Sequence, residues 1–408
     1  MQFLQVTPVV EVLQMIKDRF RPVDTEEIAA REAGGRYTAC DILAPEDVPA
    51  FDRSTVDGYA VRAAETFGAQ ETLPVMLELA GEVQIGEMAQ PLNPGECVYV
   101  PTGGMLPAGA DAVVMIEQTE VIGAVVHIFR QVTPGENRIE RGEDTGKGRV
   151  IIKRGREIRG AELGLLASLG ISNIKVFRRP RVGIISTGNE VVPPETKCLA
   201  PGQIRDSNQT ALAYLAARAG ADVIEGEILP DSYGVFLEKI QAMLSRVDML
   251  VLSGGSSVGV HDYTARVLRE LAGGPLLVEG IAVQPGKPTI IADCKGQPVL
   301  GLPGHPVSAL NIFSFFGTAL IKHLSGAVGE GWRAYVTARL TRNVPSRPGV
   351  TEMVRVVLER TPEGVAATPV FGRSGLLRTL TEADGMILLA EETEGLTAGE
   401  EVQVYLRE

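Results

Sequence analysis

Carboxylates on turns are the residues of this chain best suited to chemistry. They recur directly after short apolar runs, where strands of a sheet would end. A single such carboxylate is usually a solvated residue or a helix cap, so a catalytic role depends on several of them converging. Converging carboxylates would suit Mg²⁺, which favours oxygen ligands and often bridges a carboxylate to a substrate phosphate. The candidates, together with one hydroxyl, are Asp57, Thr102, Asp144, Glu190, Asp206, Asp231 and Asp262.

The stretch 248–263, DMLVLSGGSSVGVHDY, predicts an anion-binding turn. An apolar run ends in Ser253, Gly254 and Gly255, and a helical pattern follows. In the order strand, turn and helix, successive backbone N–H groups point at one spot, and the helix start adds about half a positive charge there. Such a spot holds phosphate or an oxyanion. An ordinary tight turn between a strand and a helix is the other interpretation.

Two more rigid turns could contact an anion. Lys287 lies between two prolines in QPGKPT, but the glycine spacing is one residue too long for a nucleotide-binding P-loop, and Pro288 stands where that loop needs Ser or Thr. The stretch 302–308, LPGHPVS, places His305 between two prolines before a predicted helix. A surface lysine and a hydrogen-bonded loop histidine are the plainer interpretations.

The bulk composition bounds the class of protein. The 408 residues exceed the ~250–300 that one core usually serves, so several domains are expected. A net charge of −12 argues against nucleic-acid binding, and the apolar runs are shorter than the ~20 residues that span a bilayer. We see no export signal and no CxxC pair, so we expect a cytoplasmic protein without disulfides. The absence of HExxH and GxGxxG argues against a zinc protease and a dinucleotide dehydrogenase.

The elements that must position these residues suggest an α/β multidomain protein. A first helix with an apolar stripe runs from Val9 to Phe20, and a second short helix is predicted from Glu26 to Ala33. Strands alternating with helices then predict a doubly wound parallel sheet, whose ligands bind beyond the carboxyl ends of its strands. We expect a mixed N-terminal domain at 1–45 plus 144–178, an inserted β domain at 46–143, the α/β domain at 179–328 and a C-terminal β barrel or sandwich at 329–408.

Nine motifs in a fixed order resemble those of one family. They are FDRSTVDGYAVR, VPTGGMLPAGADAVV, RGEDTGKG, ISTGNEVV, GQIRDSN, LSGGSSVGVHDY, QPGKP, GLPGHPVSALN and GRSGLLRTLTEADGMILL. Each is a weak signal alone, but the ordered set resembles the MoeA family of molybdopterin molybdenumtransferases, which includes the gephyrin E domain. The resemblance runs the full length of the chain. It implies an α/β domain similar to the MogA fold and a C-terminal β barrel.

The resemblance also implies a reaction and a site. Adenylylated molybdopterin and molybdate would give molybdenum cofactor and AMP, with Mg²⁺ assisting, in a homodimer whose cleft forms between the α/β domain of one chain and the N-terminal domains of the other. Transient contact with the adenylyltransferase is a further expectation. The implied catalytic residues are Asp57, Asp144, Glu190, Asp231, Asp262 and Lys287, of which Asp57, Asp231 and Asp262 would bind Mg²⁺. Pterin, phosphate or oxyanion would contact Thr102, Asp206, Ser253, Gly254, Gly255, Pro303, His305, Pro306, Ser308 and Ser374.

One departure from the family pattern and three alternatives stay open. Many members carry Asn where this chain has His305, which leaves the choice between molybdate and tungstate undecided. A tungstate-preferring paralogue is therefore one alternative. A molybdopterin adenylyltransferase is the second, because it shares the α/β core but does not need the other domains. A scaffold or cofactor-binding protein is the third, although the candidate carboxylates are all intact.

Overall fold

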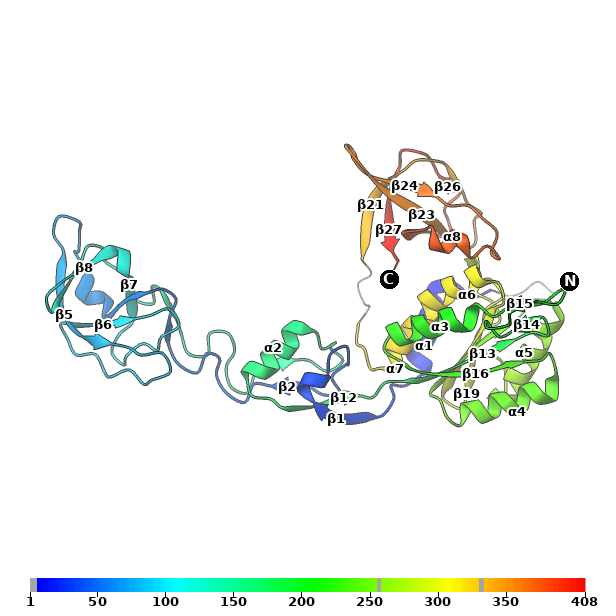
Figure 1. Ribbon diagram of the computed structural model, residues 1–408, viewed down its shortest axis with the longest axis horizontal. Helices are drawn as coiled ribbons and strands as arrows, with labels where there is room; N and C mark the ends of the chain where they lie inside the picture. Colours follow the sequence, from blue (N-terminus) through cyan, green and yellow to red (C-terminus); the bar gives the residue numbers. More distant parts are fainter. Residues whose placement is uncertain (1–5, 255–257, 330–333, 408) are drawn as a thin grey trace. The chain divides into compact units, whose positions relative to one another are not determined.

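The computed structural model describes residues 6–254, 258–329 and 334–407, with side chains in the second range from Tyr263 onward (Figure 1). The chain forms two compact units. Unit 1 contains Met1–Ala39, Gly155–Arg159 and Lys175–Glu408, and unit 2 contains Cys40–Arg154 and Gly160–Ile174. The chain therefore passes between the units four times.

Unit 2 is built on the predicted β insert. Its six-stranded sheet has the order β7-β4-β6-β5-β9-β8. The pairs are antiparallel except for β5 and β6, and alternating apolar residues such as Val61, Val114 and Val126 are buried between them. The strands are β4 (Gly58–Val61), β5 (Val75–Glu82), β6 (Glu96–Val100), β7 (Ala112–Met115), β8 (Thr119–Ile122) and β9 (Val125–Ile128).

Two short strand pairs and one helix lie outside that sheet in unit 2. β2 (Ile42–Leu43) pairs with β11 (Val150–Ile152), and β3 (Arg53–Ser54) pairs with β10 (Arg138–Ile139). The helix is α2 (Gly160–Ser168). The segment between β2 and β3 is also bonded to the segment between β10 and β11. The carboxylate of Asp47 accepts hydrogen bonds from Arg141 Nε and from the N–H of Lys147, both at 2.8 Å.

The predicted helix from Glu26 to Ala33 is wrong. Thr25–Ala29 is strand β1, which pairs with β12 (Asn173–Phe177), and only Ala30–Glu32 turns as a short 3₁₀ helix. So short a helix has little stability of its own, and pairing with a distant strand decides the conformation.

The α/β domain contains the predicted doubly wound sheet, in the order β16-β13-β17-β20-β19. The first four strands are parallel, and only the edge strand β19 is antiparallel. The strands are β13 (Arg181–Thr187), β16 (Asp222–Leu229), β17 (Met249–Gly254), β19 (Ile290–Cys294) and β20 (Gln297–Pro303). The helices are α1 (Val9–Arg19), α3 (Asn208–Arg218), α4 (Tyr233–Leu244), α5 (Val258–Ala272), α6 (Pro306–Ile312) and α7 (Thr318–Leu324) (Figure 1).

Apolar residues cover both faces of this sheet. On one face Ile184 and Val251 pack against α3, α6 and α7, and the stripe of α1 joins them through Val12 and Ile16. On the other face the apolar residues of α4 and α5 form a second core. The first helix therefore belongs to the α/β core. The 19-residue segment Pro306–Leu324 is long and apolar enough to cross a membrane, but 67% of its most apolar window is buried inside the protein, as expected of a core helix.

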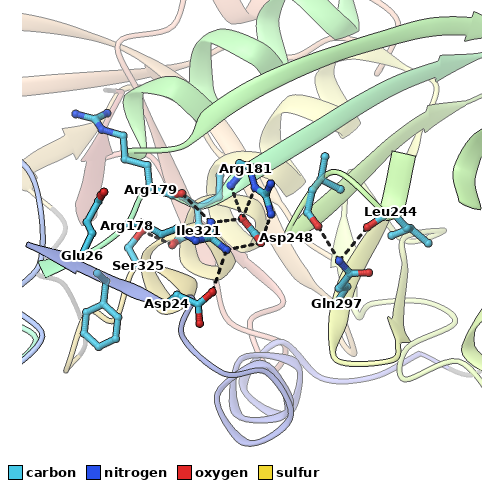
Figure 2. Close-up of polar contacts among 12 residues, drawn as sticks. Asp24, Glu26, Arg178, Arg179, Arg181, Leu244, Asp248, Gln297, Ile321 and Ser325 are labelled. Carbon is cyan, nitrogen blue, oxygen red and sulfur yellow. Dashed lines mark hydrogen bonds and ion pairs between the residues drawn. The ribbon is translucent and has the colours of Figure 1, made fainter. Parts of the chain in front are cut away.

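The amino edge of the sheet is held by ion pairs (Figure 2). Arg178, which precedes β13, donates to both oxygens of Asp248, which precedes β17, at 2.6 and 2.7 Å. The backbone N–H of Arg181 also donates to Asp248 Oδ2, at 2.7 Å. Burial alone would raise the pKa of Asp248, but these hydrogen bonds outweigh it and bring the pKa down to about 2. These contacts tie two neighbouring strands together at the edge opposite their carboxyl ends.

The C-terminal region is the predicted β barrel. Five strands close on themselves, because β23 pairs with both β24 and β25 while β21 and β27 complete the circle. Small and branched residues such as Ala338, Val356 and Val404 fill its interior. β18 (Val283–Gln284) of the α/β domain adds to β23. The barrel strands are β21 (Tyr335–Leu340), β23 (Thr351–Thr361), β24 (Gly364–Pro369), β25 (Gly385–Leu389) and β27 (Glu401–Leu406).

Candidate functional site

The carboxyl ends of the four parallel strands meet at one edge of the sheet. Thr187 of β13 pairs with Leu229 of β16 and with Gly254 of β17, and Gly254 pairs with Pro303 of β20. The strands therefore end in register. Ligands of doubly wound sheets bind just beyond such an edge. The sequence candidates that directly follow these strands, Glu190, Asp231 and His305, are thus carried by neighbouring loops.

Two residues at this edge must be glycines, because neighbouring atoms leave no space for a side chain. A Cβ on Gly254 would overlap Thr187 Oγ1, so the two strands approach each other closely at their ends. Gly188 has a φ of +140°, and a Cβ there would lie 2.7 Å from Glu190 Oε2. The carboxylate of Glu190 thus folds back over the turn that follows β13.

Asp231 is fixed by a reciprocal pair of bonds. Its N–H donates to Asn189 Oδ1 at 3.1 Å, and the N–H of Asn189 approaches Asp231 Oδ2 at 3.4 Å. These bonds join the turns after β13 and β16. The other carboxylate oxygen, Asp231 Oδ1, is buried and has no hydrogen-bond partner. Asp231 therefore offers one oxygen for a further contact.

Asp206 caps the helix α3, for which the sequence allows either Asp206 or Ser207 as the cap. Its Oδ1 accepts the N–H groups of Asn208 and Gln209 at 3.0 and 3.1 Å. Only 6% of Asp206 is exposed, and its Oδ2 has no partner. The cap explains one oxygen of this carboxylate, and the second is left for the proposed ligand contact.

Asn208 is a site residue that the sequence reasoning missed. Its Nδ2 donates to Ser253 Oγ at 2.8 Å and to the carbonyl oxygen of Gly304 at 2.9 Å. The candidate Ser253 is thereby tied to the loop that carries Pro303 and His305. The only sequence signal was its place in GQIRDSN.

Five buried oxygens gathered around these strand ends have no hydrogen-bond partner. Buried polar atoms are normally paired, so a set of unpaired ones indicates a polar binding edge rather than a packed core. The oxygens are Ser186 Oγ, Thr187 Oγ1, Asp206 Oδ2, Asn208 Oδ1 and Asp231 Oδ1.

The structure brings His305 and Ser374 together. His305 is the residue before α6, with Pro306 at the first helical position. Its Nδ1 lies 2.9 Å from Ser374 Oγ, and the N–H of Val307 donates to the carbonyl oxygen of Ser374 at 3.1 Å. A loop of the barrel is therefore bonded to the start of α6, in which Ser308 is buried.

The turn that carries Lys287 packs against α6. A Cβ on Gly286 would overlap the side chain of Ile312, and Thr289 Oγ1 donates to the Gly286 carbonyl at 2.6 Å. Lys287 itself is exposed. The turn follows β18, which pairs with β23, so this lysine is carried next to the barrel sheet.

Arg355 on β23 is a second residue that the sequence reasoning missed. It is 7% exposed, and burial lowers its pKa. Its Nη2 donates to the carbonyl oxygen of Gly372 at 3.3 Å, two residues before Ser374, while Nε and Nη1 are buried without partners. A buried and largely unpaired guanidinium is costly, which makes it a candidate for binding an anion. In the sequence it is hidden within the strand pattern EMVRVVLE.

Unit 2 brings Asp57 and Thr102 together. Asp57 precedes β4, and Thr102 follows β6, the antiparallel neighbour of β4. The start of β4 therefore lies beside the end of β6. The N–H of Thr102 donates to Asp57 Oδ1 at 2.7 Å and its hydroxyl donates to the same oxygen at 2.9 Å. These two bonds, the backbone one first, lower the pKa of Asp57. Gly58 is needed beside it, because a Cβ there would overlap the carbonyl oxygen of Val114.

For three sequence candidates the part of the chain that the structure describes gives no side-chain contact with the rest of the site. Asp144 lies on the connecting segment of unit 2, where its N–H donates to the Val48 carbonyl at 3.0 Å and its side chain is exposed. Asp262 lies on the helix α5, but its side chain is outside the described residues. Gly255 is outside them altogether.

Most of the chain matches known protein families, in three consecutive regions. Residues 7–170 match the MoeA N-terminal region (domain I and II), residues 183–323 match a domain described as probable molybdopterin binding domain, and residues 337–406 match the MoeA C-terminal region (domain IV). The chain belongs to the MoeA family. The resemblance inferred from the motifs is thereby confirmed.

Individual relatives cover nearly the full chain. The molybdopterin molybdenumtransferase of Bacillus subtilis is 32% identical over 406 residues, 98% of this chain and 94% of that protein. The enzyme of the same name from Haemophilus influenzae is 34% identical over 389 residues, 94% of each chain. A crystal structure of the MoeA protein from Pyrococcus horikoshii matches with a TM-score of 0.80 at 39% identity, covering 98% of this chain and 99% of the other. These matches confirm the predicted architecture.

Proposed function

We propose that this protein is a molybdopterin molybdenumtransferase, which converts adenylylated molybdopterin and molybdate to molybdenum cofactor and AMP. The B. subtilis and H. influenzae relatives carry this name over nearly the full chain. The observation that carries the proposal is the polar edge of the α/β sheet, where four strands end in register and five buried oxygens have no partner. These oxygens support binding of a ligand rich in hydrogen-bond donors, such as a pterin, and the two hydroxyls among them can also donate to a phosphate.

The start of α5 and the end of β17 support phosphate binding. Gly254 allows the chain to run close to Thr187, and the 15-residue helix α5 begins at Val258. A helix start of this length favours an anion. Ser253, Gly254 and Gly255 are the proposed phosphate or pterin cradle, and Glu190 on the neighbouring turn would orient the attack that releases AMP.

The described residues fit Mg²⁺ only as an ion shared with the substrate. Among the residues whose side chains are described, 6–254, 263–329 and 334–407, no three His, Cys, Asp or Glu side chains gather to hold a metal. Mg²⁺ commonly takes one or two carboxylates and completes its shell with substrate phosphate and water. The unpaired Oδ1 of Asp231 suits that arrangement, and Asp57 and Asp262 stay proposed ligands. When bound, the ion would offset charge on the phosphoanhydride.

The oxyanion is proposed to bind beside the barrel. Arg355 bonds to Gly372, and two residues further Ser374 bonds to His305. Lys287 follows the strand that pairs with β23. A dianion such as molybdate or tungstate would pair with the buried guanidinium of Arg355. Because the chain as a whole carries a net charge of −12, binding an anion requires such a local positive group. Positive charge would thus be concentrated where the anion binds.

The carboxylates of unit 2 are proposed to act in the same reaction. The two bonds from Thr102 keep Asp57 ionised, which suits a role in binding Mg²⁺ or orienting the attack. Asp144, which is exposed, is the second proposed catalytic carboxylate of unit 2. We also propose a cytoplasmic homodimer that contacts the adenylyltransferase transiently. Light scattering that gives the mass of a single chain would contradict the dimer.

The four-domain division at 1–45 plus 144–178, 46–143, 179–328 and 329–408 stays a proposal. Limited proteolysis would test it, with first cuts expected near residues 178 and 328. The barrel is bonded to the α/β domain through β18 and through His305, which favours an activity that uses both over adenylyl transfer by the α/β domain alone.

A direct assay separates the candidate functions. The protein is incubated with adenylylated molybdopterin and Mg²⁺, molybdate is added, and AMP is measured. Release of AMP that depends on molybdate is expected. Consumption of ATP with molybdopterin would instead identify an adenylyltransferase, and neither activity would identify a binding or scaffold protein. Tungstate in place of molybdate tests the preference that His305 leaves open.

A further inference from the structure

We propose that Asn208 is a positioning residue that aims the Ser253 hydroxyl at the ligand and holds the Gly304 loop in place. The proposal rests on the proposed function, in that the ligand is taken to be adenylylated molybdopterin. Asn208 is the first residue of α3 and is 7% exposed. It bonds both to β17 and to the loop that follows β20, although it belongs to neither.

The orientation of the Asn208 amide is determined by its partners. The Gly304 carbonyl oxygen can only accept a hydrogen bond, so the Nδ2 group, and not Oδ1, must face it. The 2.9 Å contact to Gly304 and the 2.8 Å contact to Ser253 Oγ then use both hydrogens of Nδ2. The amide oxygen is turned away from both, and it is buried without a partner.

The direction of the Ser253 hydroxyl follows from that orientation. A hydroxyl carries one hydrogen, and Ser253 Oγ already accepts from Asn208. Its own hydrogen must therefore point elsewhere. Ser253 is the last buried residue of β17 before Gly254, at the edge where the cradle is proposed. The hydroxyl is thus set as a donor for a phosphate or pterin acceptor.

The bond to Gly304 places the second loop. Ser253 pairs with Leu302 and Gly254 with Pro303, and Gly304 is the first residue beyond that pairing. The bond from Asn208 adds one contact just beyond that pairing, and it holds Gly304 next to His305 and the start of α6. Loss of this bond would let the loop shift, and small displacements of a positioned loop cost large factors in rate.

The neighbouring residue provides a matched control. Gln209 also donates two amide hydrogens to the chain, to the carbonyl oxygens of Ile184 at 3.1 Å and of Gly226 at 2.7 Å. Those oxygens belong to β13 and β16, before the strands reach the binding edge. Changes at Gln209 therefore remove as many hydrogen bonds from the same helix turn without touching either loop.

The test compares Asn208→Ala and Asn208→Asp with Gln209→Ala and Gln209→Glu. In Asn208→Asp the new carboxylate oxygen can only accept, so it draws the Ser253 hydrogen towards itself and away from the ligand. We expect the KM for adenylylated molybdopterin to rise about tenfold to a hundredfold in Asn208→Asp, and less in Asn208→Ala, where the hydroxyl can still turn to the ligand. Both Gln209 variants should keep the wild-type KM, even where their thermal stability falls equally.

A second measurement does not depend on activity. Amide hydrogen exchange over residues 304–308 of the full chain without substrate should accelerate in both Asn208 variants and stay unchanged in the Gln209 variants. Unchanged exchange, or equal KM values across all four variants, would overturn the role of Asn208. If the wild type releases no AMP, the proposed function fails, and the exchange result alone decides whether Asn208 positions the loop.

Discussion

The ion pair between Arg178 and Asp248 gives a stability prediction with a defined pH range (Figure 2). In Asp248→Asn the carboxylate loses its charge but keeps its shape. The two bonds from Arg178 Nη1 and Nη2, at 2.6 and 2.7 Å, lose their charge-assisted partner. The bond from the Arg181 N–H is weakened as well. The neighbouring strands β13 and β17 should therefore separate more readily at their amino edge.

The magnitude follows from the pKa of Asp248. Its pKa falls from 3.8 to about 2, because the arginine hydrogen bonds outweigh the effect of burial. That lowering of the pKa corresponds to about 2 kcal/mol of stability at neutral pH. Since the folded-state pKa is the lower one, this stability is present above pH ~4 and is lost as the pH falls towards 2. About half of it should remain at pH 3.

Native-state hydrogen exchange is the suitable assay, because a chain with more than one unit has no single free energy of unfolding. The opening free energy of β17, residues 249–254, should fall by about 2 kcal/mol in Asp248→Asn at pH 7, and the difference from the wild type should become smaller at pH 3. The matched control is Asp222→Asn, an exposed carboxylate at the start of β16. A loss of opening free energy that is the same at pH 7 and pH 3, or that is equally large in Asp222→Asn, would refute the reasoning.

Three further predictions concern the site. In Thr102→Val, loss of the 2.9 Å bond should raise the pKa of Asp57, so the acid side of the pH profile for AMP release should move to higher pH. In Arg355→Met, the KM for molybdate should rise by about tenfold to a hundredfold while thermal stability holds or rises, because a costly buried charge is removed. In Gly254→Ala, the new methyl overlaps Thr187 Oγ1, so native-state hydrogen exchange should record a loss of about 1–3 kcal/mol in the opening free energy of β17.

The first and the last of these have a control that the chain itself offers. Thr102→Ser keeps the hydroxyl and should restore the wild-type pH profile; a profile that shifts equally would remove the hydroxyl from the explanation. Gly234→Ala, on α4 with open space around it, should stabilise by about 0.5–1 kcal/mol where Gly254→Ala destabilises. An unaltered molybdate KM in Arg355→Met would exclude Arg355 from the anion site.

Local patterns were sufficient for much of the fold. The alternation of buried strands and helices predicted the parallel sheet, because each element buries its own apolar residues. The cap of α3 could be narrowed to Asp206 or Ser207, since a cap depends only on the next few residues, and Asp206 is the one that accepts the N–H groups. The strand β1 was missed for the opposite reason, because its pairing partner β12 lies about 150 residues away.

The site residues differ in the same way: some could be found from the local sequence pattern, and others depend on contacts between distant parts of the chain. Ser253 and Gly254 could be found from the strand, turn and helix pattern around them. Asn208 and Arg355 could not, because an asparagine in a polar motif and an arginine within a strand look ordinary until the contacts across the fold are known. The pairing of His305 with Ser374 likewise spans 69 residues.

The central claim is best tested by AMP release from adenylylated molybdopterin in the presence of Mg²⁺. We expect the purified full-length chain to release AMP when molybdate is added, and Asp231→Asn to slow that release strongly while its thermal stability changes little. Failure of the wild type to release AMP on addition of either molybdate or tungstate would contradict the account.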